Sequence, residues 1–480
     1  MKKLKMGIYS FKNGILRAVK VLFVVCIVLV FYFVFITCYQ GATFYYKGNI
    51  LYVLLYTFLL SAFLFTYGSL RDDFSSFQGL LFSFSLSVLI TNFISYFTIC
   101  LFARAMLEIY PVLIVLCVQV ALAIPYYWLM QLLHRELNPS KHAIALIVNC
   151  DYEMRIIREF NRKNSLIVID EIACDPQQIE NIYYKIDQYS AIVIGHLQLE
   201  VREAILLYAF QQNKKVILLP SPHDVLFNSA TPIFLDDSLI YSFRNHCFSA
   251  DQLAIKRLTD VFISIILLLL SLPLWLITSI AIKLTDGGPV FYKQERLTRN
   301  RNSFELIKFR SMIVDAERET GAVQAKKDDE RITKVGKLIR MTRIDELPQL
   351  LNIIKGDMSL VGPRPERPEI YEKICKRFPE FSMRLNVKAG LTGYAQIRGR
   401  YNTSYEDKIK MDLYYIENAN WLMDIRLILN TIKILFLPES TEGFSAGQTT
   451  AMTQDIVDYD KVDIIYSDGE ENEEKTVQNS

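Results

Sequence analysis

The run Val261–Ile282 reads VFISIILLLLSLPLWLITSIAI and contains no charged residue. It is long enough to cross a bilayer as a helix of roughly 20 residues. Pro273 in its middle removes a helix hydrogen bond, and Ser271 can satisfy a carbonyl group that is left free. Basic residues flank both ends, Lys256-Arg257 before the run and Lys283 after it. Because basic flanks stay on the cytoplasmic side, we expect a re-entrant helix that enters and leaves by one leaflet.

Four earlier apolar runs are each long enough to span a membrane. They are Val19–Cys38, Ile50–Leu70, Leu80–Phe102 and Met106–Met130. With 51% hydrophobic residues and a mean hydropathy of +0.21, the chain has the composition of a membrane protein. Lysine and arginine gather before the first run, so we expect a cytoplasmic N-terminus and, after four crossings, a cytoplasmic remainder. A kinked fifth crossing at Val261–Ile282 is the alternative, and it would place the following domain outside the cell.

Residues 136–250 alternate between strand and helix patterns, which is typical of a small Rossmann-like parallel sheet. The expected strands are His142–Asn149, Ser165–Ile169, Ala191–Gly195 and Lys215–Leu219, with helices at Glu153–Asn164 and Glu200–Gln212. The first strand-to-helix turn, Asn149-Cys150-Asp151-Tyr152, has no glycine, so the dinucleotide fingerprint is missing. We interpret the domain as a scaffold or regulator, and whether it binds a nucleotide stays open.

The last folded region is predicted to be a mainly α-helical domain over residues 251–438, including the re-entrant helix. Within it, basic residues between Arg331 and Arg343 alternate with apolar ones, as in a helix lying along anionic headgroups. Eight scattered cysteines and five histidines without ligand spacing give no disulfide framework and no transition-metal site. The polar, acidic tail at 439–480 is expected to be disordered.

Two adjacent carboxylates stand in the segment Thr342–Gln349, which reads TRIDELPQ. We expect Asp345 to be a helix N-cap, Glu346 the first helical residue and Pro348 part of the first turn. The helix dipole and nearby arginines then favour ionised carboxylates, able to attack phosphorus or to hold a divalent cation. An ordinary N-cap with a solvated neighbour is the alternative for such a pair taken alone.

Further motifs surround this pair in a fixed order. They are Lys256-Arg257 with Asp260, Pro273, Gly288-Pro289-Val290-Phe291 with Gln294 and Arg296, Lys308-Phe309-Arg310-Ser311-Met312, Asp345-Glu346-Leu347-Pro348-Gln349, Gly362-Pro363-Arg364-Pro365 and Gly390-Leu391-Thr392-Gly393. This order resembles the polyprenyl-phosphate hexose-1-phosphate transferases, monotopic bacterial sugar transferases, over nearly all of residues 256–437. Four leading helices and a degenerate Rossmann-like domain look like the long-form members. The turn at 297–302 departs from the family pattern because it lacks glycine; Asn300 or Asn302 can adopt the left-handed conformation instead.

The resemblance implies that hexose-1-phosphate passes from a UDP-hexose, glucose or galactose, to undecaprenyl phosphate with release of UMP. This would be the first membrane step of capsule or exopolysaccharide synthesis. Asp345 would be the nucleophile that forms a phosphosugar-aspartate intermediate, and Glu346 would hold Mg²⁺. The residues that would bind phosphate are Lys308, Arg310, Gln349, Arg364 and Arg367.

The resemblance also implies a multi-pass protein of the bacterial plasma membrane with its catalytic domain on the cytoplasmic face. Its partners would be the two substrates and the lipid bilayer, with no nucleic acid, and a homo-oligomer is left open. A non-catalytic membrane-bound nucleotide sensor is one alternative function. An ordinary glycosyltransferase is another, and it would release UDP rather than UMP.

Overall fold

The computed structural model describes residues 12–39, 47–71, 77–137, 141–148, 150–163, 167–173, 179–228, 230–243, 248–314, 329–399 and 403–435. The chain divides into two compact units, one up to Pro220 and one from Ser221. Each is described by itself below. The predicted acidic tail at 439–480 lies outside the described residues, and the domain boundaries placed at 135, 250 and 438 stay predictions.

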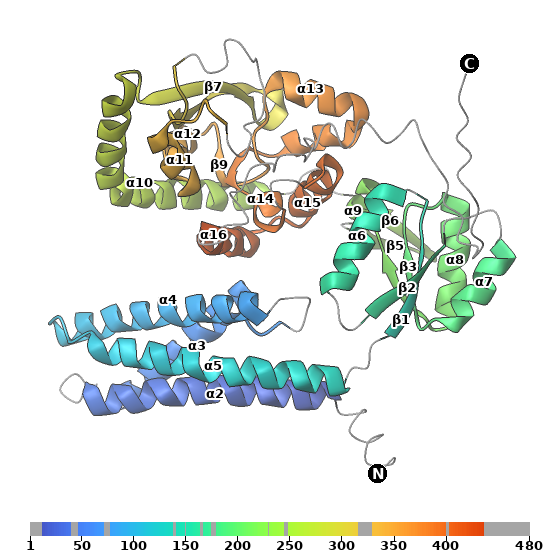
Figure 1. The fold of residues 1–480 in the computed structure, drawn as a ribbon, viewed down its shortest axis with the longest axis horizontal. Coiled ribbons are helices and arrows are strands. Elements are labelled where there is room, and N and C mark those ends of the chain that lie inside the picture. Colours follow the sequence, from blue (N-terminus) through green and yellow to red (C-terminus); the bar gives the residue numbers. More distant parts are fainter. Residues whose placement is uncertain are drawn as a thin grey trace. The chain divides into compact units, whose positions relative to one another are not determined.

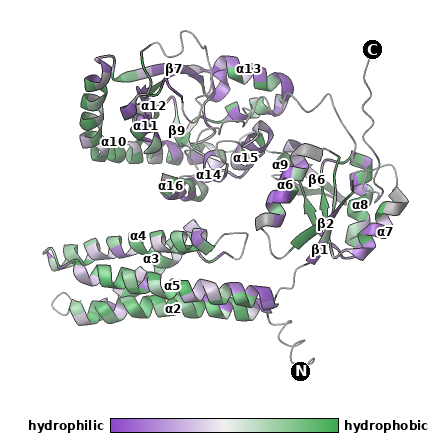
Figure 2. Cartoon of the chain, in the orientation of Figure 1, coloured by the Kyte–Doolittle hydropathy of each residue, from purple (hydrophilic) through white to green (hydrophobic). Residues whose placement is uncertain are grey.

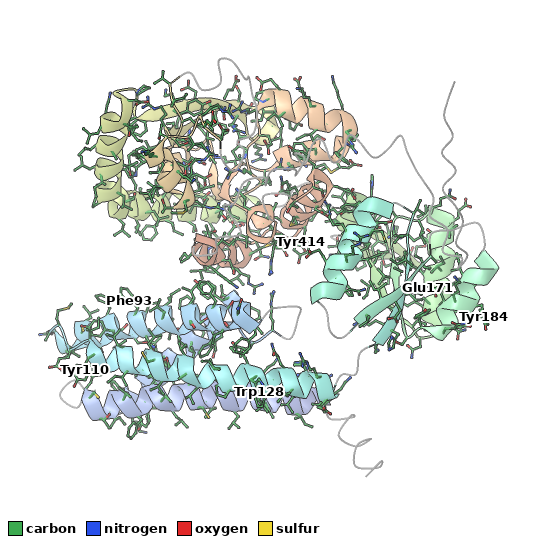
Figure 3. All side chains as sticks on the ribbon, viewed as in Figure 1. Phe93, Tyr110, Trp128, Glu171, Tyr184 and Tyr414 are labelled. Atoms are coloured by element: carbon green, nitrogen blue, oxygen red, sulfur yellow. The ribbon has the colours of Figure 1, made fainter. Side chains whose placement is uncertain are left out.

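Four long apolar helices open the first unit (Figure 1). They are α2 (Lys12–Cys38), α3 (Gly48–Tyr67), α4 (Phe77–Ala103) and α5 (Tyr110–Leu137). Each is long and apolar enough to cross a membrane, and apolar residues run along their whole length (Figure 2). Large side chains such as Phe93, Tyr110 and Trp128 are exposed on the outside of the bundle, where lipid would cover them (Figure 3). The four predicted apolar helices are confirmed, and the protein is a multi-pass membrane protein.

Polar side chains meet inside this bundle and connect all four helices. Tyr56 on α3 donates to Oδ1 of Asn92 on α4 at 2.9 Å, and Asn92 donates to Oε1 of Gln119 on α5 at 2.9 Å. Gln119 in turn donates to the Tyr56 hydroxyl at 2.8 Å and to the carbonyl of Ile27 on α2 at 3.2 Å. Because lipid offers no hydrogen bonds, such groups must satisfy one another, and here they fasten the helices together.

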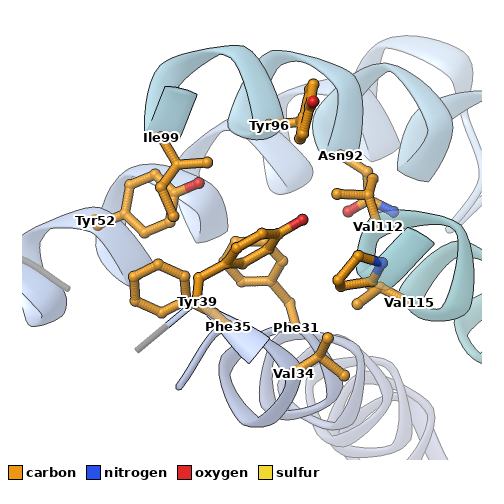
Figure 4. A pocket seen from close by; sticks show the side chains of 11 residues that line it. Phe31, Val34, Phe35, Tyr39, Tyr52, Asn92, Tyr96, Ile99, Val112 and Val115 are labelled. Carbon is orange, nitrogen blue, oxygen red and sulfur yellow. The ribbon is translucent and has the colours of Figure 1, made fainter. Parts of the chain in front are cut away.

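A small cavity of about 20 Å³ lies between the bundle helices (Figure 4). Aromatic side chains form much of its wall, among them Phe31, Phe35, Tyr52 and Tyr96. A cavity of this size holds about one water molecule. It is therefore a packing defect of the helix bundle and too small for a sugar or a prenyl chain.

The rest of the first unit is a parallel α/β sheet. Its elements are β1 (Lys141–Leu146), α6 (Cys150–Lys163), β2 (Ile167–Ala173), α7 (Ile179–Gln188), β3 (Ala191–Ile194), α8 (Leu199–Gln211) and β4 (Lys215–Leu218). The strand order is β2-β1-β3-β4, with every pair parallel. Separate apolar clusters cover the two faces, as expected for strands buried on both sides. The predicted Rossmann-like architecture is confirmed.

The second unit is mainly helical. Its helices are α9 (Pro222–Phe227), α10 (Ala250–Asp286), α11 (Lys334–Met341), α12 (Gln349–Lys355), α13 (Pro368–Arg377), α14 (Tyr394–Arg398), α15 (Tyr405–Asn418) and α16 (Trp421–Leu435). Its strands are β5 (Thr231–Leu235), β6 (Ser238–Ser242), β7 (Phe291–Leu297), β8 (Ser303–Phe309), β9 (Ser359–Val361) and β10 (Gly390–Thr392). Three short 3₁₀ segments are η2 (Arg299–Arg301), η3 (Ile344–Glu346) and η4 (Pro379–Asn386). Strands β7 and β8 form an antiparallel hairpin, and β9 pairs with β10 in parallel. In the turn between β7 and β8, Asn300 has a φ of 58°, so it takes the left-handed conformation predicted for the missing glycine.

Helix α10 is sharply bent into two arms (Figure 1) and contains Pro273. Ser271 donates to the carbonyl of Leu268 at 3.0 Å, as expected beside a proline that interrupts the helix ladder. The first arm is tied to the body of the second unit by Lys256, which donates to Asp424 at 2.6 Å, and by Asp260, which accepts from Ser359 at 2.7 Å.

The second arm of α10 returns to the same body. Trp275 packs against Phe291 and Phe309, with ring centroids 5.9 and 5.3 Å away, and Ile282 is buried in the same apolar cluster. Apolar side chains such as Leu270 and Leu276 remain exposed along the helix. A straight spanning helix would carry its second half away from this body, so the bend supports the re-entrant interpretation.

Cysteine labelling tests this topology. Single cysteines at Asp251 and Thr285, in a background without the native cysteines, are expected to react with a membrane-impermeant maleimide only after cells are opened. Both positions are exposed at the two ends of α10. Pro273→Ala restores the helix ladder, so a fraction of its molecules should expose residue 285 to the outside. Labelling of residue 285 from outside in the chain that retains Pro273 would show a fifth crossing.

Candidate active site

The carboxylate pair lies on a 3₁₀ turn, and this corrects one prediction. Asp345 is not a helix N-cap: η3 covers Ile344–Glu346, and α12 begins only at Gln349, with Pro348 before it. The reason is Arg343, whose φ of 55° places it in the left-handed region at the end of α11. Its carbonyl accepts from the N–H of Glu346 at 3.1 Å, so the chain is already turning before Asp345. A non-glycine residue in this region is strained, which is common at functional sites.

The Gly362-Pro363-Arg364-Pro365 motif follows strand β9 and lies beside β10. The N–H of Gly362 donates to Thr392 at 2.9 Å, and the N–H of Gly390 donates to Pro363 at 2.9 Å. A Cβ atom on Gly390 would collide with the backbone of Gly362, so glycine is required for this close approach. The pairing of two short strands thus positions Arg364.

Two predicted cations meet Glu346. Arg364 donates to Oε1 of Glu346 at 2.8 Å, and Nζ of Lys308, from strand β8, lies 3.7 Å from the same atom. Asp345 differs from its neighbour, because among the described residues no side chain donates a hydrogen bond or forms an ion pair with its carboxylate. One carboxylate is anchored between two cations, and the other lies close to them without a direct partner.

The electrostatics separate the two carboxylates further. Burial raises the pKa of Asp345 to about 6, and repulsion from Glu346 adds to the rise, against the opposing effect of Lys308, Arg340 and Arg364. Burial alone would raise the pKa of Glu346 too, but Arg364, Lys308 and Arg343 outweigh it and hold this pKa at about 2. Burial lowers the pKa of Lys308, and Glu346 opposes that change. The Glu346 carboxylate is therefore charged throughout the physiological pH range, whereas the Asp345 carboxylate becomes charged as the pH rises through about 6.

The other predicted phosphate ligands have contacts of their own. Gln349 is buried as the first residue of α12, and Arg367 precedes α13. Arg310 is buried in an ion pair with Asp286 at the end of α10, and none of its described contacts reaches either carboxylate. Lys308 and Arg364 are thus the predicted cations that the structure brings to the pair. Arg340, one of the upstream arginines expected to favour ionised carboxylates, also contributes to the field at Asp345.

The donor set can accept Mg²⁺ only together with a phosphate. No group of three or more His, Cys, Asp or Glu side chains suited to a metal occurs in the described part of the chain. Magnesium is usually held by one or two carboxylates together with water and substrate phosphates. Glu346 matches that pattern as a single carboxylate ligand when a diphosphate supplies further oxygens.

The Rossmann-like sheet has a position where backbone N–H groups bind an anion. The carboxylate of Glu153, which the sequence analysis did not single out, occupies it. Glu153 of α6 accepts from the N–H of Val148 after β1 at 3.1 Å and from the N–H of His196 after β3 at 2.6 Å. Its side chain is fully buried, and a Cβ on Gly195 would collide with it. In open sheets of this kind, ligands bind where the strand order reverses, which here is beyond the carboxyl ends of β1 and β3.

Comparisons with known proteins agree with this site. Residues 251–438, which include all of α10 but its first residue and both site motifs, match the family model described as bacterial sugar transferase. A UDP-glucose:undecaprenyl-phosphate glucose-1-phosphate transferase of Caulobacter vibrioides is 38% identical over 192 residues, which are 38% of this chain and 71% of that protein. The fold and the site define a membrane-bound sugar transferase. The chain belongs to the bacterial sugar transferase family, and the predicted resemblance is confirmed.

Two other relatives carry different sugar names. A UDP-N-acetylgalactosamine-undecaprenyl-phosphate N-acetylgalactosaminephosphotransferase of Aeromonas hydrophila is 40% identical over 184 residues, which are 38% of this chain and 43% of that protein. Galactosyl transferase CpsE of Streptococcus agalactiae is 41% identical over 212 residues, which are 42% of this chain and 45% of that protein. The match therefore covers less than half of these two relatives, and the sugars in the three names differ.

Proposed function

We propose that this protein transfers a sugar-1-phosphate from a UDP-sugar to undecaprenyl phosphate at the cytoplasmic face of the bacterial plasma membrane, as the first membrane step of polysaccharide synthesis. The observation that carries the proposal is the contrast within the carboxylate pair. Glu346 is anchored by Arg364 and Lys308, whereas Asp345 lies in their field without a direct partner among the described residues. A carboxylate held close to cations but not bound by them is suited to attack a phosphorus atom that those cations attract.

The reaction balances as two displacements at one phosphorus. An oxygen of Asp345 attacks the β-phosphorus, its new bond replaces the bond to the bridging oxygen, and UMP leaves with that oxygen. A phosphate oxygen of undecaprenyl phosphate then attacks the same phosphorus and releases the Asp345 carboxylate. Lys308 and Arg364 would turn from Glu346 towards the diphosphate, which they orient and whose charge they offset. Bound Mg²⁺, held by Glu346 and phosphate oxygens, would supply further charge neutralisation.

The nucleotide that is released tests the function. Purified full-length protein in undecaprenyl-phosphate-containing vesicles is incubated separately with UDP-glucose, UDP-galactose and UDP-N-acetylgalactosamine, and both nucleotide and lipid products are measured. We expect UMP and a lipid diphosphosugar from one of the three donors. Release of UDP would indicate sugar transfer without phosphate and contradict the proposal. The names of the relatives favour glucose, galactose or N-acetylgalactosamine without choosing between them.

The pH dependence gives a second test. Asp345 attacks only as the carboxylate, so kcat/KM is expected to fall by roughly tenfold per pH unit below its pKa. With that pKa raised to about 6, the fall should begin near pH 6 rather than near the ordinary range of an aspartate, close to pH 4. Rates of UMP release between pH 4.5 and 8 measure it. A rate that stays constant down to pH 5 would show that Asp345 does not titrate as the attacking group.

A further inference from the structure

Side chains from elsewhere in the second unit complete the support of the loop that carries Arg364. Backbone N–H groups donate to the carbonyls at its two ends, Gly390 to Pro363 and Leu297 to Glu366. The carbonyls of Arg364 and Pro365 between them need other donors. Two arginine side chains supply them: Arg384 donates to the carbonyl of Arg364 at 3.1 Å, and Arg296 donates to the carbonyl of Pro365 at 3.1 Å.

Arg384 is itself tightly fixed. Its Nε donates to Oδ2 of Asp412 on α15 at 2.6 Å, and its guanidinium lies 4.4 Å from the ring centroid of Phe381. Arg384 is 6% exposed and Asp412 is 1% exposed. Burial raises the pKa of Asp412, and the Arg384 guanidinium opposes that rise. A buried pair of this kind is costly to break because it leaves an uncompensated charge.

The three contacts of Arg384 require an arginine at position 384. One face of the guanidinium covers Phe381, one edge bonds Asp412, and another N–H reaches the Arg364 carbonyl. A lysine carries the same charge but presents a compact ammonium without the planar fork. It cannot satisfy Asp412 and the carbonyl in the same directions.

We propose that Arg384, oriented by Asp412, is a positioning residue for the transfer reaction: it fixes the backbone of Arg364 and so aims the Arg364 side chain at Glu346 and the substrate diphosphate. This inference rests on the proposed function. The connection runs from α15 through η4 and the proline-rich loop to the carboxylate pair. Lys408 and Glu366 also face the Arg384–Asp412 pair, so the pair belongs to a larger charged group behind the loop.

The test measures kcat and KM for the UDP-sugar at one pH, per mole of folded protein. If the backbone of Arg364 is no longer fixed, its side chain loses its direction towards the substrate diphosphate. Arg384→Lys and Asp412→Asn are both expected to lower kcat by about 10²-fold, the scale for a misplaced catalytic geometry.

A matched control comes from the same helix. Lys410 and Glu406 of α15 form another largely buried ion pair at 2.6 Å. Lys410→Met removes it and should leave kcat/KM close to normal. If Arg384→Lys and Asp412→Asn lose no activity, or lose as much activity without the Arg364 side chain as with it, the pair is structural and the proposal is overturned. The same conclusion follows if neither variant accumulates as folded protein while Lys410→Met does.

A double-mutant cycle completes the experiment. In an Arg364→Ala background the guanidinium is already gone, so adding Arg384→Lys should lower kcat/KM no further. A further loss as large as the loss caused by Arg384→Lys alone would show that Arg384 acts by another route. Failure of the proposed function would look different, because the chain without substitutions would then release no UMP from any donor.

Discussion

Asp345→Asn is expected to abolish transfer while the protein remains folded. The amide keeps the shape of the side chain but removes the charge that attacks phosphorus, and loss of a covalent nucleophile costs on the order of 10⁴–10⁶-fold in kcat. Release of UMP from the UDP-sugar measures the effect. Without undecaprenyl phosphate, a donor labelled in its β-phosphate should leave label on the unchanged protein and none on the variant.

Asp357→Asn is the matched control for this experiment. Asp357 follows α12, and its carboxylate contacts Lys355 at 3.2 Å rather than the site cations. Its replacement should leave both labelling and turnover close to normal. Substantial turnover by Asp345→Asn would remove the covalent step from the proposed mechanism, even if UMP remained the product.

Glu346→Gln is the second change with a large expected effect. It removes the partner of Arg364 and Lys308 and the proposed ligand of Mg²⁺, so kcat should fall by roughly 10²–10³-fold, the scale for loss of one charge-stabilising group. It also removes the repulsion that raises the pKa of Asp345. The pH below which kcat/KM falls should therefore be lower in this variant.

Titration with Mg²⁺ at several pH values distinguishes the two roles of Glu346. If Glu346 is a metal ligand, the variant needs more Mg²⁺ for half-maximal activity, and kcat/KM also begins to fall at a lower pH. A lower pH for this fall with unchanged Mg²⁺ dependence would leave Glu346 as an anchor for Arg364 only. If the activity, the pH dependence and the Mg²⁺ dependence are all unchanged, Glu346 is not part of the site.

The parts that the sequence predicted are those set by local patterns. Apolar runs give the four bundle helices, and strand and helix periods give the parallel sheet, because both depend on neighbouring residues. The bend of α10 follows from Pro273 and Ser271 in one short segment. Lys308, Arg364 and the carboxylate pair were found because each belongs to a motif, and the structure brings these four side chains into one group.

The parts that the sequence did not predict depend on distant contacts or on single dihedral angles. Asp345 matched an N-cap by residue type, but the left-handed Arg343 starts the turn earlier, and no local pattern requires that conformation. Arg310 stays a predicted phosphate ligand, and its ion pair with Asp286 joins two motifs that no local pattern connects. Arg384 and Asp412 lie in different helical segments, so only the folded chain brings them together.

Glu153 has a consequence for how the Rossmann-like sheet meets solutes in the cell. An incoming phosphate would have to compete with a carboxylate that is part of the same chain, and a tethered group of this kind acts at an effective concentration of about millimolar. A nucleotide present at micromolar levels would displace it only by binding these two N–H groups about a thousandfold more tightly than the carboxylate does. The crevice between β1 and β3 therefore carries its own competitor, which sets a threshold of affinity for any ligand that enters it.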